Sequence, residues 1–302
     1  MRKGYIPFRL NYSLDNMRSI LSEVIKYPRT AVLVADEQSK REVVDIIGEK
    51  EYAEAGVPCI FTVSEIKGME YTYVVCFDLI GCYKSIWEQM LHDKSASHKT
   101  KYRYYFNLLY VAMTRAQEYL CFVDKETVND LESRFNLRQE DRFDSKVFQF
   151  DRLSNLFSDW IEQAREFEQA GKYEEAIAVY KKAHASQADI YRCEINLAIQ
   201  NRNFERVVQY CILTEDVEGV QQYLDEPMTE EAKALSTLYV SLIKNCDIPK
   251  GYQSSYIQLT EQVYRTFNSE EVSKVKDIFQ QAYLNTLDSL VESIRRIAGD
   301  IV

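Results

Sequence analysis

The chain has 302 residues, of which 46% are hydrophobic and 28% are charged, a composition typical of globular proteins of about two domains. No apolar run predicts a transmembrane helix, and the first residues do not form a signal peptide. The net charge of −10 lies after residue 127, because residues 1–127 contain 17 basic and 17 acidic residues. We therefore expect no non-specific nucleic-acid binding by the C-terminal half. The balanced charge of the N-terminal half neither predicts nor excludes such binding.

Cysteine and histidine are the residues from which a metal site or a thiol catalyst would be built. The chain has seven cysteines and three histidines, and no Cys-x-x-Cys pair. Most of the cysteines lie in apolar runs, so we expect buried, reduced thiols in a cytoplasmic protein. We expect neither a metal site nor a Cys–His catalytic pair.

Residues 1–127 alternate strand-like and helix-like segments. Four apolar runs are predicted as strands, at 31–35, 58–63, 71–80 and 119–123. Amphipathic segments predict helices at 16–26 with Asp15 as N-cap, at 37–50 with Asp36 as N-cap, and at 102–117. The polar stretch 92–100 is predicted to be an exposed loop. This alternation predicts an α/β domain with a parallel sheet and right-handed crossovers.

From residue 128 onward the periodicity becomes helical. Residues 128–150 are predicted to form a charged junction, and residues 151–302 an all-α domain. The segment 160–183 alternates small and aromatic residues around Gly171 and resembles a tetratricopeptide repeat, an αα-hairpin. A degraded copy of the repeat is expected at 191–211, and the last 50 residues are predicted to form two more helices, at about 254–267 and 270–298. An unrelated array of helical hairpins is the alternative.

Two segments contain the residues with the clearest chemical meaning. TVSEIKGMEY (62–71) places Lys-Gly-x-Glu between two predicted strands, and YVAMTRA (110–116) comes directly before an apolar strand. In this order and spacing they resemble motifs V and VI of the UvrD/Rep-like superfamily-1 helicases. The preceding AVLVADEQSKREVV (31–44) resembles the start of the same domain. The resemblance covers about residues 28–125 and implies a second RecA-like domain in residues 1–127.

The resemblance implies a role for each matching residue. Arg115 matches the catalytic arginine that contacts the γ-phosphate of ATP, a role that suits an always-charged guanidinium. Gly68 and Glu70 match residues that line the nucleotide, the glutamate towards the ribose. Thr62 matches a threonine near the nucleic-acid backbone, and Ser64 lies beside it in the same motif. The alternative for each is an ordinary structural or surface role.

Some expected residues are absent. Ala35 and Asp36 stand where a motif IV arginine is expected, and Arg41 is the nearest arginine downstream. Ser64 replaces a frequent histidine, and positions 106–107 are Phe-Asn where charged residues are common. The sequence contains no GxxxxGK[ST] P-loop and no convincing Walker B strand. Its short spacing before motif V also leaves no room for a large inserted domain.

Two hypotheses follow. In the first, the chain is the C-terminal part of an ATP-dependent superfamily-1 DNA or RNA helicase, inactive alone, that binds ATP and Mg²⁺ only with an upstream P-loop domain. Its partner would be single-stranded nucleic acid, DNA in preference to RNA. In the second, it is a complete, non-catalytic binding module with a degenerate RecA-like platform; an unrelated α/β enzyme is a more distant third.

The acidic helical domain is expected to bind a basic protein or peptide, unless its helices pack back onto the α/β domain. We expect no membrane partner.

Overall fold

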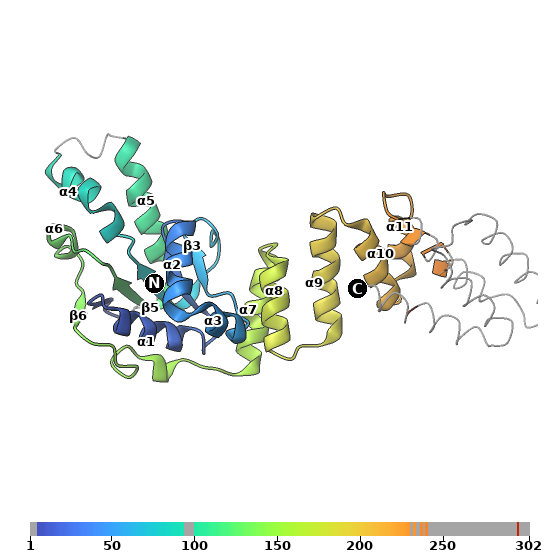
Figure 1. Ribbon diagram of the computed structural model, residues 1–302, viewed down its shortest axis with the longest axis horizontal. Helices are drawn as coiled ribbons and strands as arrows, with labels where there is room; N and C mark the ends of the chain where they lie inside the picture. Colours follow the sequence, from blue (N-terminus) through green and yellow to red (C-terminus); the bar gives the residue numbers. More distant parts are fainter. Residues whose placement is uncertain are drawn as a thin grey trace, which may run out of the picture. The chain divides into compact units, whose positions relative to one another are not determined.

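The computed structural model describes residues 5–93 and 100–229, together with positions 232, 233, 236, 237, 239, 240 and 295. The chain divides into two compact units, Met1–Ala185 and Ser186–Val302. The first unit contains a sheet and the first helical pair of the C-terminal region, and the second contains further helices (Figure 1). Apart from residue 295, the helices predicted at 254–267 and 270–298 lie outside the described residues.

Six parallel strands form the sheet of the first unit, in the order β3-β2-β4-β5-β1-β6. Because parallel neighbours cannot be joined by hairpins, the chain crosses over the sheet between them. The predicted α/β class, followed by helices, is confirmed. The strands are β1 (Phe8–Leu10), β2 (Thr30–Val34), β3 (Ile60–Thr62), β4 (Tyr71–Phe77), β5 (Ala116–Val123) and β6 (Arg138–Glu140).

The helices of the described residues lie between and after these strands. In the first unit they are α1 (Leu14–Val24), α2 (Glu37–Ile47), α3 (Glu49–Ala55), α4 (Lys84–His92), α5 (Thr100–Thr114), α6 (Asn129–Glu132), α7 (Phe157–Gln169) and α8 (Tyr173–Lys182), with short 3-10 helices at Gly81–Tyr83 and Phe150–Arg152. In the second unit they are α9 (Gln187–Gln200), α10 (Phe204–Leu213) and α11 (Val217–Gln222). No helix of the described residues is long and apolar enough to span a membrane.

The central strands are buried on both faces, as expected for a parallel sheet. All of β2 is buried, and its alternate residues Val32 and Val34 join the core formed with α1 and α2. Leu33 and Val74 are also buried and point to the opposite face, because successive side chains of a strand alternate. On that side α5 packs against β4 and β5 (Figure 1).

Most of the elements predicted in residues 1–127 are present, with corrected ends. The first helix begins at Leu14, and its N-cap is Ser13, not Asp15, because the Ser13 side chain accepts a hydrogen bond from the Asn16 amide. Asp36 caps α2 as predicted. The predicted helix 37–50 is interrupted at Gly48, whose φ of 98° the helix cannot accommodate. Strand β5 begins inside the span predicted as helix.

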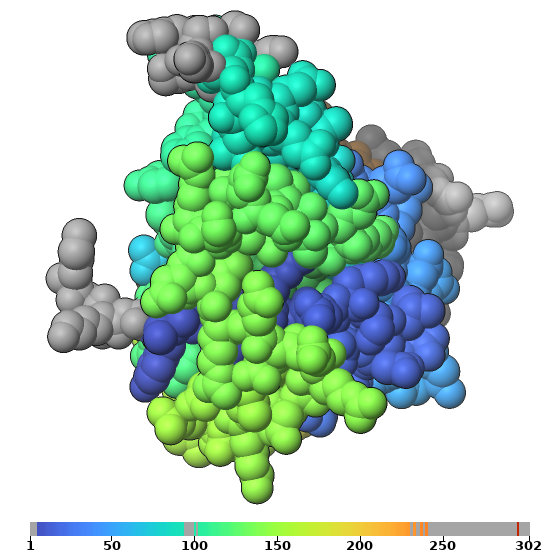
Figure 2. All heavy atoms as spheres, turned by 90° about the vertical axis from the view of Figure 1, so that its left-hand side faces the viewer, coloured from blue at the N-terminus to red at the C-terminus, as the bar shows by residue number. Residues whose placement is uncertain are grey.

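The predicted junction 128–150 is part of the α/β core, and the sequence analysis missed β1, β6 and α4. The junction supplies α6 and β6, and its Phe148 and Phe150 are fully buried against the core of α1 and β1. Figure 2 shows this segment, in green, lying across the blue residues of β1 and α1. The side chain of Asn16 holds the segment 128–150 against α1. Its oxygen accepts a hydrogen bond from the Phe143 amide, and its nitrogen donates one to the Asp141 carbonyl.

A buried ion cluster joins the carboxyl ends of the central strands. Nη1 of Arg9, in β1, lies 2.6 Å from Oδ2 of Asp124 and 3.4 Å from Oε1 of Glu132. The other carboxylate oxygen of Asp124 accepts hydrogen bonds from the amides of Ile80 and Gly81. Burial raises the pKa of Asp124 to about 6, although the Arg9 charge opposes this shift. The cluster therefore connects β1, β5, α6 and the turn after β4.

The segment predicted to resemble a tetratricopeptide repeat forms an αα-hairpin, α7–α8. Gly171 makes the turn with a φ of 73°, and the small side chains of Ala164 and Ala176 are fully buried. The ring of Phe167 lies 6.1 Å from that of Phe61 in the sheet. This first hairpin therefore packs back onto the α/β fold, which is the alternative stated for the helical region.

Helices α9 and α10 of the second unit form at the predicted degraded copy, 191–211. They pack through Ala198 and Val207, which are buried, and through Tyr191 and Tyr210, whose ring centroids are 5.5 Å apart. Helix α11 packs on α10.

Candidate functional site

The two motif segments meet where β4 and β5 begin. Tyr71 pairs with Ala116, and the Tyr71 amide donates a 2.8 Å hydrogen bond to the Arg115 carbonyl. Since the amino ends of neighbouring parallel strands share one edge of a sheet, Gly68, Glu70 and Arg115 come together there. We call this part of the sheet the amino edge.

The Arg115 guanidinium is half-buried and is held by backbone carbonyl groups. Its Nη1 donates to the Met69 carbonyl at 3.0 Å, and its Nε donates to the Val111 carbonyl at 3.3 Å. Among the described residues no carboxylate forms an ion pair with it. These bonds use two of the five N–H donors of the guanidinium and neutralise none of its charge. Arg115 is thus oriented yet still able to bind an anion.

Glu70 and Gly68 lie in the exposed loop before β4. The Glu70 carboxylate accepts a 3.0 Å hydrogen bond from Nε2 of Gln117, which orients it beside the start of β5. Gly68 has a φ of 88°, and a Cβ placed on it would have no atom within 4 Å. The backbone conformation favours glycine here, and the space around it stays open for a ligand.

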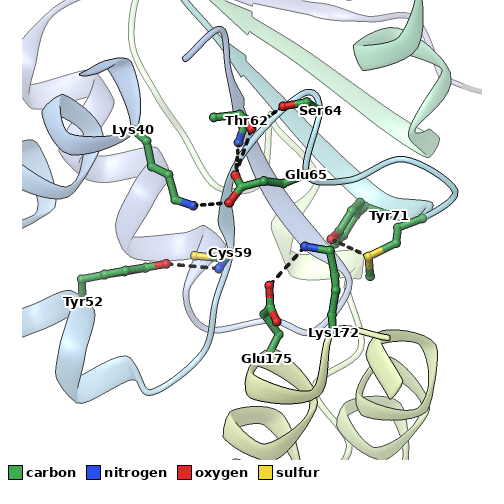
Figure 3. Close-up of polar contacts among 10 residues, drawn as sticks. Lys40, Tyr52, Cys59, Thr62, Ser64, Glu65, Tyr71, Lys172 and Glu175 are labelled. Atoms are coloured by element: carbon green, nitrogen blue, oxygen red, sulfur yellow. Dashed lines mark hydrogen bonds and ion pairs between the residues drawn. The ribbon is translucent and has the colours of Figure 1, made fainter. Parts of the chain in front are cut away.

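Thr62 and Ser64, by contrast, lie where β3 ends. Thr62 is buried; its amide donates to Oε2 of Glu65 at 2.6 Å, and its hydroxyl bonds Glu65 and Ser64 at 3.0 Å (Figure 3). Lys40 of α2 pairs with the other oxygen of Glu65 at 2.8 Å. Burial raises the pKa of Glu65, but hydrogen bonds from Lys40 and Thr62 outweigh it and leave that pKa lowered. The polar atoms of Thr62 are therefore used within the protein, and only Ser64 is exposed.

Arg29 is a residue of the amino edge that the sequence analysis missed. It precedes β2 with a φ of 57°, a conformation uncommon outside glycine. Its guanidinium lies 3.1 Å from Glu166 and 3.6 Å from Glu162, both on α7, and one nitrogen is 3.5 Å from the Gln117 side-chain oxygen. Its Nε is buried without a hydrogen-bond partner. Burial raises the pKa of Glu166, while Arg29 lowers it. In the sequence, the one feature that marks Arg29 is its position directly after Pro28.

The position expected for a motif IV arginine has a structural role in this chain. Oδ1 of Asp36 accepts hydrogen bonds from the amide and hydroxyl of Ser39 at the start of α2. The backbone hydrogen bond from Ser39 is the largest influence on Asp36 and lowers its pKa. Arg41 is exposed on the same helix. Asp36 therefore begins α2 at the position where the arginine was expected.

No protein-family model, no curated protein and no solved structure matches this chain. The resemblance to superfamily-1 helicases therefore depends on the motif residues and on their placement. Within the described part of the chain no group of histidine, cysteine or acidic residues could hold a metal ion, and the cysteines there are free thiols.

Proposed function

We propose that residues 1–127 are the second RecA-like domain of a UvrD/Rep-like superfamily-1 ATPase and supply one half of its ATP site. The observation that supports this most directly is the juxtaposition of Arg115 and Glu70 at the amino edge. Arg115 is oriented by two carbonyl groups and has no carboxylate partner in the described residues. Charged groups removed from water are usually paired, so the unpaired charge of Arg115 suits the binding of an anionic ligand.

The residues fit one side of a nucleotide. The free N–H donors of Arg115 suit the terminal phosphate, where positive charge stabilises the transferring phosphoryl group. The exposed carboxylate of Glu70 can accept a hydrogen bond from a ribose hydroxyl, and Gly68 leaves room beside it. In this proposal Arg115 is a catalytic residue, and Glu70 and Gly68 bind the nucleotide.

The other side of the nucleotide must come from elsewhere. The sequence has no P-loop to cradle the phosphates, and the described residues have no cluster that would hold Mg²⁺. A P-loop domain outside these 302 residues would therefore bind the phosphates and the metal ion. Closure of the two domains around ATP would move the protein along single-stranded nucleic acid.

In this proposal the helical region is a tetratricopeptide-like appendage, and the helices after α8 bind a protein partner, because the first hairpin packs on the sheet. The buried alanines of α7–α8 and the turn at Gly171 support the repeat assignment for the first hairpin. All of the net charge of −10 lies after residue 127, so a basic peptide is the partner that its charge favours.

The experiment begins with the polypeptide in which the sequence naturally occurs. An antibody against residues 151–302 should detect a protein well above 35.4 kDa. ATP hydrolysis by that protein, measured with and without single-stranded DNA, should fall by about 10³- to 10⁵-fold in Arg115→Ala. Arg165→Ala, which removes an exposed arginine of α7, is the matched control and should hydrolyse ATP normally.

Two results would contradict the proposal. Robust ATP turnover by the 302-residue chain alone, lost in Arg115→Ala, would show that no second domain is needed. A native protein near 35.4 kDa that binds no P-loop partner would favour a non-catalytic binding module.

A further inference from the structure

Helix α5 exposes three large aromatic side chains. Tyr104, Phe106 and Tyr110 have exposed fractions of 60%, 56% and 58%. The other large hydrophobic residues that are exposed in the described part of the chain lie within its first residues, at the start of α7 or singly in α9. On α5 they are concentrated within about two helical turns, while Leu109 and Ala112 of the same helix are buried.

The aromatic rings are arranged as a stacking surface. Phe106 and Tyr110 are four residues apart, so they lie on the same side of the helix. Their rings are nearly parallel, with an interplanar angle of 12° and a centroid distance of 6.4 Å. Tyr104 lies edge-on against Tyr105, which itself packs on Tyr83 after β4. Tyr104 stands two residues before Phe106 and therefore on a different side of the helix, so the stacking surface consists of Phe106 and Tyr110.

The charge of this segment is opposite to that of the whole chain. Residues 94–117 contain five basic residues and no aspartate or glutamate, although the chain has a net charge of −10. Arg103 is exposed on α5 between the aromatic residues and the start of the helix. In the chain, Asp93 and Glu118 flank this segment, and Glu88 and Asp93, on and after α4, line a hollow beside Tyr102.

Aromatic faces beside cations are the chemistry that binds single-stranded nucleic acid. Every base has a π-face that stacks on Phe or Tyr, and each phosphate is attracted by Arg or Lys. A duplex offers no unstacked bases, so the same surface should discriminate against it. Thr62, assigned to the nucleic acid from the motif alone, uses its polar atoms internally.

We propose that the exposed face of α5, formed by Arg103, Phe106 and Tyr110, binds single-stranded nucleic acid by base stacking. This inference rests on the proposed function, because it names where that motor holds its strand. Phe106 and Tyr110 stack on successive bases, and Arg103 contacts a phosphate. Stacking reads no base sequence, so the surface binds any single strand with free bases, and the 2′-hydroxyl is not required.

The test measures binding of the 302-residue chain to fluorescent oligo(dT) and oligo(rU) of about 20 nucleotides by anisotropy. Phe106→Ala and Tyr110→Ala should each raise Kd about 5- to 100-fold for both strands. Phe106→Tyr and Tyr110→Phe should bind like the wild type. Arg103→Ala should weaken binding and reduce the slope of log K against log salt by about 0.7.

Phe157→Ala is the matched control, because Phe157 is an equally exposed aromatic residue on α7. It should leave Kd unchanged, and circular dichroism should show that all variants are folded. Wild-type affinity in the α5 alanine variants, equal affinity for duplex DNA, or no binding by the wild type would each overturn the inference. So would α5 variants that only change self-association, since these would identify a protein contact.

The two proposals can fail separately. Basal ATP hydrolysis by the larger polypeptide is expected to depend on Arg115, whereas Phe106→Ala should raise the DNA concentration needed for stimulation. Loss of α5-dependent binding with a normal Arg115 effect would remove only this inference. Normal oligonucleotide binding through α5 without any Arg115 effect would remove only the ATPase proposal.

Discussion

At the carboxyl edge of the sheet Arg9 is enclosed by two carboxylates, whereas at the amino edge Arg115 donates to two backbone carbonyl groups and pairs with no carboxylate of the described residues. The Arg9 side chain is 2% exposed, and its cluster includes backbone amides that complete the hydrogen bonding of Asp124. Arg115 keeps its charge and most of its donors. The same residue type is therefore neutralised at one edge of the sheet and left without a carboxylate partner in the described residues at the other.

Arg9→Met should have the largest effect on folding. It leaves Asp124 and Glu132 buried without their cation, and breaking such a pair costs about 3–5 kcal/mol. Urea denaturation should show this loss in the free energy of unfolding. Arg115→Met breaks two hydrogen bonds to carbonyl groups and should cost only about 1 kcal/mol. Equal costs at the two edges would contradict the comparison.

The second-largest effect is expected in the pH dependence of stability, to which Asp124 at the carboxyl edge contributes. The pKa of Asp124 is raised to about 6 in the folded protein from 3.8, so the folded state holds this proton more tightly than the unfolded state. Its contribution to stability is therefore full below about pH 4 and is lost as the pH rises through about 6, by about 2–3 kcal/mol. Denaturation midpoints from pH 4 to 7.5 should show this decline in the wild type and not in Asp124→Asn. An identical pH profile in both proteins would remove Asp124 as the cause.

Gly68 and Gly81 lie on either side of β4, so substitutions there compare how tightly the two edges of the sheet are packed. A Cβ on Gly81, after β4, would overlap Oδ1 of Asp78 and lie 3.0 Å from the Glu126 amide nitrogen. Gly81→Ala should therefore destabilise by about 1–3 kcal/mol. Gly68→Ala meets no atom and costs only its backbone strain, about 1 kcal/mol. Thermal unfolding of both variants measures the difference, and a larger loss at Gly68 would mean that the amino edge is the more tightly packed.

The smallest effect on stability is expected at Glu70. Glu70→Gln removes an exposed charge with one hydrogen-bond partner, Gln117, and should change the free energy of unfolding by less than about 0.5 kcal/mol. In the larger ATPase polypeptide it should raise the KM for ATP with little change in kcat. A stability loss as large as that of Arg9→Met would make Glu70 a structural residue.

The predicted strands β2 and β4 and the cap at Asp36 came from local patterns that the structure confirms. Continuous apolar runs and a capping side chain are properties of a few adjacent residues, so they can be read without the rest of the chain. The strands β1 and β6 could not be predicted. Each has only three residues, one contains the charged Arg9, and the other is the polar Arg-Gln-Glu of residues 138–140. They are strands because β5 offers an unpaired edge to β1, and β1 then offers one to β6.

The residues of the candidate site also fall into two groups, those that the sequence predicts and those that only the structure reveals. Arg115, Gly68 and Glu70 could be named from motif residues, and the structure brings all three to one edge. Arg29 and Gln117, which lie beside them, have no local signature. Their contacts join β2, β5 and α7, segments far apart in the sequence.

The sequence by itself determined the α/β class, the change to helices after the sheet and the positions of the charged motif residues. Tertiary structure decided where the core ends, because Phe148, Phe150 and Phe167 are buried only when distant segments cover them. It also decided which arginine is neutralised and which is left open. Charge compensation depends on distances of a few ångströms between residues more than a hundred positions apart, as between Arg9 and Asp124.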